Sequence, residues 1–151
     1  MIIIVDTREK DLHILKKFDK LKIPYIRKKL DYGDYSFEID GVSYEDKICI
    51  ERKKSLDELA GNFTKGRDRF KREFERAMSK KCKVHLVVED ASLERIEMGD
   101  YRSRFSPLSF KNTLSTWGHK FQFTLDFIER KNMASYILLT FQKHIEEAKK
   151  L

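Results

Sequence analysis

Four charged residues follow directly on the apolar part of a predicted strand. The stretch KICIERKKSLDEL (47–59) begins with alternating isoleucines, as a half-buried strand does, and continues as ERKK without a turn signal. Successive side chains of a strand point to opposite faces, so Glu51 and Lys53 share one face while Arg52 lies on the other. A carboxylate beside an ammonium is either an exposed ion pair, worth under about 1 kcal/mol, or part of a catalytic or metal-binding site.

Two more carboxylates stand at the ends of predicted strands. Asp34 follows Gly33 at the start of one strand, and Asp6 ends the N-terminal apolar strand MIIIV. Each has an ordinary alternative, because Asp34 can be a turn residue and Asp6 can cap the helix that follows. If these carboxylates meet Glu51 near Lys53, they repel one another unless a cation lies among them. Oxygen ligands favour Mg²⁺ or Mn²⁺, which polarise a phosphoryl oxygen, so the pattern favours phosphodiester hydrolysis.

Three stretches together resemble a known family. VDTRE (5–9), GD (33–34) and ERKKSLD (51–57) are similar to the GD…ERKxxxD signature of XPF-type nuclease domains. That family is a branch of the PD-(D/E)XK restriction-endonuclease-like superfamily. A D…ExK pattern alone is common by chance, whereas these three stretches in this order are specific, and the resemblance covers nearly the whole chain.

The resemblance implies roles for five charged residues. Asp34 and Glu51 would bind the metal, Mg²⁺ or Mn²⁺, and Lys53 would be catalytic. Asp6 would be a further acidic ligand, and Glu9 would serve a second cation. The implied activity is a metal-dependent DNA endonuclease that leaves a 5′-phosphate and a 3′-hydroxyl.

Four neighbouring charged residues keep two interpretations each. Arg52 is either structural or in contact with phosphate, and Arg8 either forms a salt bridge or contacts phosphate. Asp57 is a signature position of the family, yet the helix dipole also explains an acid there. Glu89, at the end of a buried strand, either faces the site or has a structural role.

A strongly basic segment follows the candidate site. Nine cations stand against three anions between Lys65 and Lys83, and the apolar stripe of the predicted helix leaves its arginines on another face. Such a face is either simply solvated or binds phosphate. The predicted DNA-binding residues are Arg8, Arg52, Arg67, Arg69, Arg72 and Arg76.

Composition agrees with a polyanionic partner but does not prove it. The 151 residues carry 32 Lys plus Arg against 25 Asp plus Glu, a net charge of +7. Cys49 and Cys82 belong to no metal-binding spacing, so we expect core thiols. No stretch resembles a signal peptide or a membrane span, so we expect an intracellular protein with no membrane partner.

Strands and helices alternate along the chain. The predicted strands are 1–5, 24–30, a hairpin that turns at Asp40-Gly41, 83–89 and 120–127. The predicted helices are 9–21, one that starts at Leu56 after the Ser55/Glu58 capping box, 66–82, 107–117 and 133–150. This order predicts an α/β fold with a restriction-endonuclease-like central mixed β-sheet flanked by helices. We expect one nuclease domain over 1–151, without the helix-hairpin-helix module that many family members carry.

The segment 90–106 is polar and is expected to be a loop or lid. Its residues Tyr101, Arg102, Arg104 and Phe105 either clamp DNA and stack on bases, or belong to a mobile surface loop. Trp117 is expected in the core or on a dimer face.

Three hypotheses of function remain open. The first is a DNA endonuclease that acts on branched or duplex DNA in repair or recombination, as a homodimer or paired with another nuclease-family subunit. The second is a non-catalytic DNA-binding or scaffolding pseudo-nuclease subunit. The third is a nuclease that acts on RNA.

Overall fold

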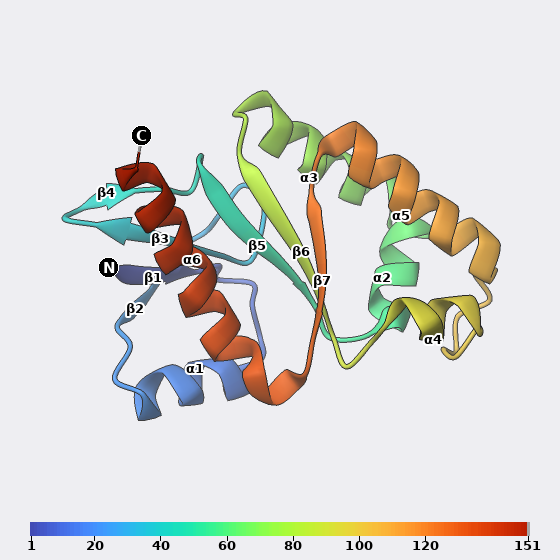
Figure 1. The fold of residues 1–151 in the computed structure, drawn as a ribbon, viewed down its shortest axis with the longest axis horizontal. Coiled ribbons are helices and arrows are strands. Elements are labelled where there is room, and N and C mark those ends of the chain that lie inside the picture. Colours follow the sequence, from blue (N-terminus) through green and yellow to red (C-terminus); the bar gives the residue numbers. More distant parts are fainter. Residues whose placement is uncertain (151) are drawn as a thin grey trace.

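The computed structural model describes residues 1–150 and contains a seven-stranded mixed sheet with helices on both faces (Figure 1). The strands are β1 (Ile2–Val5), β2 (Tyr25–Arg27), β3 (Tyr35–Ile39), β4 (Val42–Ser43), β5 (Ile48–Lys53), β6 (Lys83–Glu89) and β7 (Thr124–Ile128). The helices are α1 (Leu12–Lys20), α2 (Leu56–Phe63), α3 (Arg67–Ser79), α4 (Leu93–Glu97), α5 (Pro107–Phe121), the 3₁₀ turn η1 (Arg130–Asn132) and α6 (Met133–Lys149). The predicted fold class is confirmed.

The strand order is β2-β1-β3-β5-β6-β7, with β4 paired to β3. β3 is antiparallel to both of its neighbours in this order, β1 and β5, so β1 and β5 run in the same direction. The carboxyl ends of β1 and β5 and the amino end of β3 therefore meet at one edge of the sheet. That edge is where the predicted acidic residues stand in the sequence.

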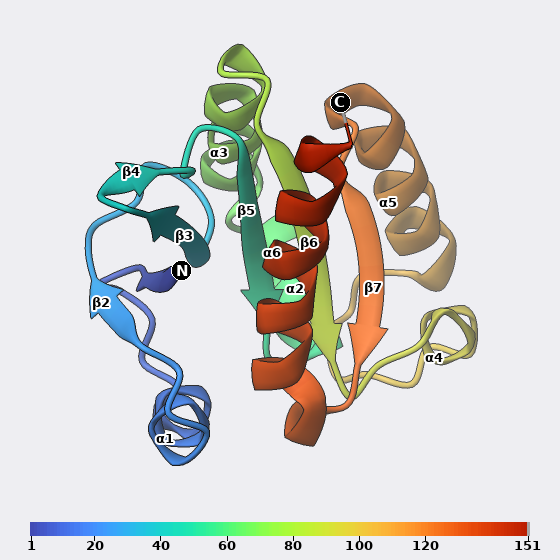
Figure 2. The ribbon, with the colours of Figure 1, turned by 60° about the vertical axis from the view of Figure 1, so that its left-hand side comes forward.

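Two separate hydrophobic cores lie on the two faces of the sheet, each beneath the helices that Figure 2 shows on that face. Helices α2, α3 and α5 cover one face, where Phe63, Phe74 and Trp117 are buried together. Helices α1 and α6 cover the other face with Phe18 and Phe141. Trp117 is therefore a core residue, which was one of its two expected roles.

β5 runs between these cores and sends alternate side chains into each. Cys49 lies in the α2/α3/α5 core, and Ile48 and Ile50 lie in the α1/α6 core. The strand continues through Lys53, and Glu51, like Lys53, is only 6% exposed. The charged residues are thus part of the buried strand, whereas the sequence suggested that they project from its end.

The helix boundaries differ from the predictions where a cap residue decides them. α1 begins at Leu12, because the Asp11 side chain accepts a hydrogen bond from the His13 amide and caps the helix. The expectation that Asp6 caps this helix is wrong. α4 lies within the segment expected to be an irregular loop, and Ser92 caps it by accepting from the Arg95 amide.

Over residues 1–150, none of the helices is both long enough and apolar enough to cross a membrane.

Candidate active site

A charged depression lies at the sheet edge where β1 and β5 end and β3 begins. It is lined by ten residues, all polar or charged: Arg8, Glu9, Lys10, Asp11, Asp34, Glu51, Arg52, Lys53, Lys54 and Glu58. The structure therefore brings the three predicted catalytic residues, Asp34, Glu51 and Lys53, to one place.

The backbone around Asp34 is fixed by hydrogen bonds to both neighbouring strands. Its amide donates to the Ile50 carbonyl at 2.8 Å, and its carbonyl accepts from the Asp6 amide at 2.8 Å. Gly33 before it has φ +77°, and a Cβ at that position would lie 2.8 Å from Cys49 Sγ, so only glycine fits. This turn directs the Asp34 carboxylate toward the end of β5, where its Oδ2 accepts from the Arg52 amide at 2.7 Å.

Lys53 lies in a buried acidic surrounding. Its Nζ is 3.3 Å from Glu51 Oε1 and 4.0 Å from Glu58 Oε1, and it lies 4.7 Å from the centre of the Phe70 ring. Burial lowers the pKa of Lys53, but the charges of Glu51 and Asp34 outweigh it and raise that pKa above its ordinary value. The amine therefore stays protonated at neutral pH.

Asp34 and Glu51 repel each other. Burial raises the pKa of Asp34, and the Glu51 charge raises it further, while Lys53 opposes both effects. A divalent cation between two such carboxylates is favourable, because its charge removes their repulsion and their oxygens coordinate it.

Asp6 is turned away from this pair. Its carboxylate accepts from the Leu30 amide at 2.8 Å and from the Arg8 guanidinium Nε at 2.9 Å, and it is only 1% exposed. Asp6 does not line the depression. Its predicted role as a metal ligand stays a prediction that these contacts do not favour, whereas its backbone positions Asp34.

Glu9 lies in the depression but already has partners. It accepts from the Tyr35 hydroxyl at 3.0 Å and from Arg52 Nη1 at 3.3 Å. Burial and the Glu9 charge raise the pKa of Tyr35, so the phenol remains a donor. The Glu9 charge also contributes to raising the pKa of Asp34, and Glu9 lines the same depression as Asp34 and Glu51.

Arg52 points to the opposite face of β5 and is the centre of a buried ion cluster. Its Nε and Nη2 donate to the two Glu89 oxygens at 2.8 and 2.9 Å, and its Nη2 donates to Asp11 at 2.6 Å. The guanidinium is only 5% exposed. These contacts favour a structural role for Arg52 over a phosphate contact. They likewise favour a structural role for Glu89 over one in the site.

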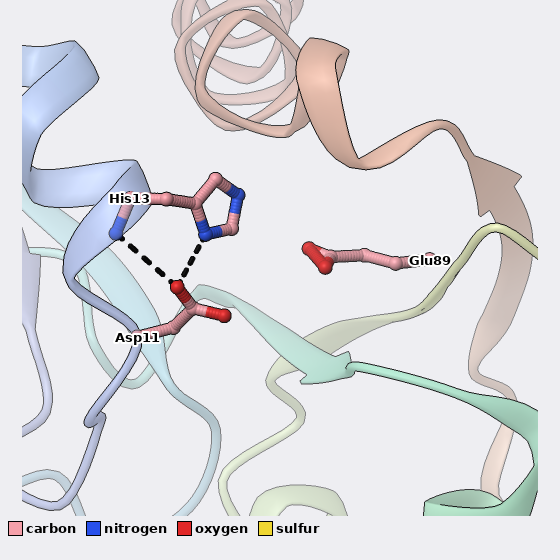
Figure 3. A group of neighbouring side chains, drawn as sticks. All are labelled: Asp11, His13 and Glu89. Carbon is pink, nitrogen blue, oxygen red and sulfur yellow. Dashed lines mark hydrogen bonds and ion pairs between the residues drawn. The ribbon is translucent and has the colours of Figure 1, made fainter.

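Asp11 and Glu89 also belong to a group of potential metal ligands with His13 (Figure 3). The ligand atoms of these three residues lie within 4.8 Å of one another. Burial opposes the effect, but hydrogen bonds from His13 lower the pKa of Asp11 to about 2. Both carboxylates already contact Arg52 and Arg130, so a cation would have to displace an arginine.

Glu73 joins the site and was not predicted from the sequence. Burial and the Glu51 charge raise the pKa of Glu73 to about 7, against the opposing effects of the Lys53 charge and the Gly33 backbone. The signal was available, because Glu73 stands three residues after Phe70 and four before Ala77, on the buried stripe of α3. An acid on an apolar stripe indicates a buried polar contact.

The predicted DNA-binding arginines fall into two groups. Arg69 and Arg72 are exposed and line a shallow pocket on α3 that also includes Glu73. Arg67 and Arg76 are engaged with the protein: Arg67 lies over the Trp117 ring at 5.0 Å, and Arg76 donates to the Asp31 carbonyl.

Arg8 forms the salt bridge that was one of its two expected roles. Its partner is Asp6, and its side chain is still 60% exposed beside the depression. The DNA contacts of all these arginines stay predictions.

Comparison with known proteins places the chain in a family. A family model described as the ERCC4 domain matches residues 5–141. The chain belongs to the ERCC4 domain family. The resemblance to XPF-type nuclease domains is thereby confirmed.

Two solved structures show the same fold as this ERCC4 domain. XPF from Aeropyrum pernix matches with a TM-score of 0.72 and 23% identity, over 95% of this chain and 61% of that chain. XPF from Aeropyrum pernix in complex with DNA matches with a TM-score of 0.71 and 22% identity, over 97% of this chain and 66% of that chain. This ERCC4 domain therefore spans less than two thirds of either XPF chain. No curated protein matches it.

Proposed function

We propose that this chain is a divalent-metal-dependent DNA endonuclease. The observation that carries the proposal is the meeting of Asp34 and Glu51 in one charged depression with a protonated Lys53. Oxygen ligands from two mutually repelling carboxylates fit Mg²⁺ or Mn²⁺. Membership of the ERCC4 family supports the same activity, because its nucleases typically use divalent metals.

Asp34 and Glu51 would hold the ion, and Glu9, which lines the same depression, would serve a second cation. When bound, such an ion polarises a phosphoryl oxygen and lowers the pKa of water. Asp34 enters this arrangement with its orientation already set by the Arg52 amide, so binding does not require the turn at Gly33 to move.

Lys53 would act on the phosphate that is being cleaved. Its ammonium is held by Glu51 and Glu58 and is only 6% exposed, so it reaches the depression from a fixed position. A preorganised cation of this kind stabilises the negative charge that develops in the transition state.

DNA is the substrate that the charge distribution favours. Arg69 and Arg72 are exposed along a pocket that includes Glu73, and Glu73 interacts with Glu51 of the site. The Aeropyrum pernix XPF that shares this fold was solved in complex with DNA. We extend the proposal to branched or structured DNA in repair or recombination, and to pairing with a second copy or another nuclease-family subunit.

A non-catalytic pseudo-nuclease subunit is the second candidate. Such a subunit would tolerate loss of a charged site residue, whereas here Asp34, Glu51 and Lys53 are all present and share one depression. This observation favours the enzyme.

A cleavage panel tests the proposal. Flap, fork, junction and linear DNA, and an RNA duplex, are incubated with the protein and Mg²⁺ or Mn²⁺. Alanine at Asp34, Glu51 or Lys53 should lower cleavage by at least about 100-fold, the usual effect of removing one transition-state contact. DNA affinity, measured in EDTA, should change little.

Exposed residues of matching charge provide the controls. Glu75→Ala and Lys16→Ala remove one exposed acid and one exposed lysine that do not line the depression, and both variants should cleave normally. Cleavage by Glu51→Ala and Lys53→Ala at the unaltered rate would refute the assignment of the site. Absence of cleavage on every substrate would favour the pseudo-nuclease.

A further inference from the structure

Asp57 contacts a loop that is distant in the sequence. Its Oδ1 accepts from the backbone amides of Arg102 and Ser103, both at 2.8 Å. Capping of α2 is done by Ser55, which accepts from the Glu58 amide at 3.1 Å. The helix dipole therefore does not account for all of the interactions of Asp57, because its carboxylate also holds the chain between α4 and α5.

The same loop is anchored from inside by its aromatic residues. The rings of Tyr101 and Phe105 pack against Phe110 of α5, with centroid distances of 5.4 and 5.3 Å. The Tyr101 hydroxyl donates to the Phe105 carbonyl at 2.6 Å, and the Phe105 amide donates to Ser103 Oγ at 3.1 Å. These contacts give the loop a defined conformation and do not favour stacking of the two rings on bases, which stays a prediction.

Two arginines of the loop remain directed to solvent. Arg102 and Arg104 are both exposed, and within residues 1–150 neither side chain has an ion-pair or hydrogen-bond partner. Asp100, the acid of the same loop, is already paired with Arg95 at 3.1 Å. The loop thus presents two unpaired cations on an ordered backbone.

The position of Asp57 places this loop beside the candidate active site. Asp57 is next to Glu58, whose carboxylate lies 4.0 Å from Lys53 Nζ. α2 and α4 follow the carboxyl ends of the adjacent strands β5 and β6, and both lie at that end of the sheet (Figure 1). The loop is therefore held by the immediate neighbour of Glu58, which lines the depression in which phosphodiester cleavage is proposed.

We propose that the loop 100–105 is a phosphate clamp for DNA, and that Asp57 is the positioning residue that fixes it. The inference rests on the proposed function of the site. Arg102 and Arg104 would contact phosphates of the strand that enters the depression. Asp57 would act only through the loop, by accepting the two amide hydrogens, and would not bind metal.

A loop backbone that is ordered before binding should strengthen the binding of DNA. An arginine on a fixed backbone loses less conformational freedom on binding than one on a loose loop, so the contact costs less entropy. Each phosphate contact also releases counterions, which makes affinity depend on salt.

DNA affinity in EDTA separates this role from catalysis. We would measure the anisotropy of a fluorescein-labelled DNA fork across a salt series. Arg102→Ala/Arg104→Ala should reduce affinity and lower the salt slope by about two, one for each phosphate contact. Asp57→Ala should reduce affinity about three- to tenfold, because part of the loop backbone must then be ordered on binding.

Two variants distinguish positioning from other roles of Asp57. Asp57→Asn keeps an oxygen that accepts both amides, so its affinity should be close to normal, whereas a metal ligand or a dipole charge would be lost. Asp57→Ala added to Arg102→Ala/Arg104→Ala should cause no further loss of affinity. Trypsin should also cut after Arg102 and Arg104 faster in Asp57→Ala than in the unaltered protein.

Matched controls cover general charge and folding. Lys16→Ala/Lys20→Ala removes two exposed cations on α1, away from the loop, and should weaken binding less. If Asp57→Ala does not fold, Ser103→Pro removes one donor from the loop side, and Ser103→Ala, which keeps that donor, is its control.

The outcomes that overturn the inference differ from failure of the proposed function. An additive loss in the triple variant, equal defects in Asp57→Asn and Asp57→Ala, or normal affinity of Arg102→Ala/Arg104→Ala would each refute the clamp. If the unaltered protein binds no DNA, the proposed function fails as well. The trypsin experiment then still decides whether Asp57 fixes the loop.

Discussion

Each face of β5 carries a cluster in which a buried cation lies among acids, but the two clusters differ in how well their charges are paired. On one face, Arg52 lies among Glu9, Asp11 and Glu89 with every partner within hydrogen-bonding distance. On the other, Lys53 is the buried amine among the carboxylates of Asp34, Glu51, Glu58 and Glu73. The two cations are adjacent in the sequence.

The difference lies in how far each cluster satisfies its own charges. Arg52 makes two parallel hydrogen bonds to Glu89, and its partners raise its pKa despite burial, so the cluster is stable as it stands. In the other cluster, acids exceed the one ammonium, and the pKa values of Asp34 and Glu73 are raised. A satisfied cluster stabilises the fold, whereas an unsatisfied one has free energy to gain from an added cation.

The largest expected effect is on stability, from breaking the satisfied cluster. Arg52→Ala leaves the buried Glu89 carboxylate without its partner and should lower the free energy of unfolding by about 3–5 kcal/mol. Glu51→Gln removes an acid from the unsatisfied cluster and should leave stability unchanged or raised in EDTA. Urea unfolding of both variants measures the contrast.

A paired substitution sharpens this result. Arg52→Met combined with Glu89→Leu removes both charges and should recover much of the stability lost in Arg52→Ala, because apolar replacement of a buried pair is often neutral. Equal stability losses in Arg52→Ala and Glu51→Gln would contradict the distinction between the two faces.

The next effect is the pH dependence that Glu73 contributes in metal-free protein. Its pKa is raised from 4.5 to about 7 in the folded state, so between these values the folded protein holds more protons than the unfolded chain. Stability from this group therefore falls as pH rises through that window. Relative to Glu73→Gln, the unaltered protein should lose about 2–3 kcal/mol between about pH 5 and about pH 8.

Urea unfolding in EDTA at the two pH values measures this loss. Glu75→Gln, on the exposed side of α3, is the control and should follow the unaltered protein. Parallel pH profiles for Glu73→Gln and the unaltered protein would show that the pKa of Glu73 is not raised in the folded protein.

The smallest expected effect is stabilisation by the ion itself. At about ten times its dissociation constant, Mn²⁺ should raise the free energy of unfolding by about 1.4 kcal/mol. Asp34→Asn and Glu51→Gln should abolish this gain, and Glu89→Gln, in the satisfied cluster, should retain it after correction for its own stability loss. A gain that depends on Glu89 and not on Glu51 would place the ion at the group formed by Asp11, His13 and Glu89.

The sequence by itself determined the contents of the two faces. A period of two assigns Glu51 and Lys53 to one side of β5 and Arg52 to the other, and this follows from backbone geometry alone. The start of α2 after Ser55 and the glycine before Asp34 are likewise local features. The fold class and the meeting of Asp34, Glu51 and Lys53 could therefore be predicted.

Only the tertiary structure decided which partner each charge takes. Asp6 turns to the Leu30 amide, Glu73 reaches the site from α3, and Asp57 holds a loop that begins more than 40 residues later. These contacts depend on how helices rotate and pack on the sheet, because side-chain partners far apart in the chain are set by packing and not by local periodicity. For the same reason, the sequence placed Arg52 and Lys53 on different faces of β5 but could not decide whether Arg52 stabilises the fold or contacts phosphate.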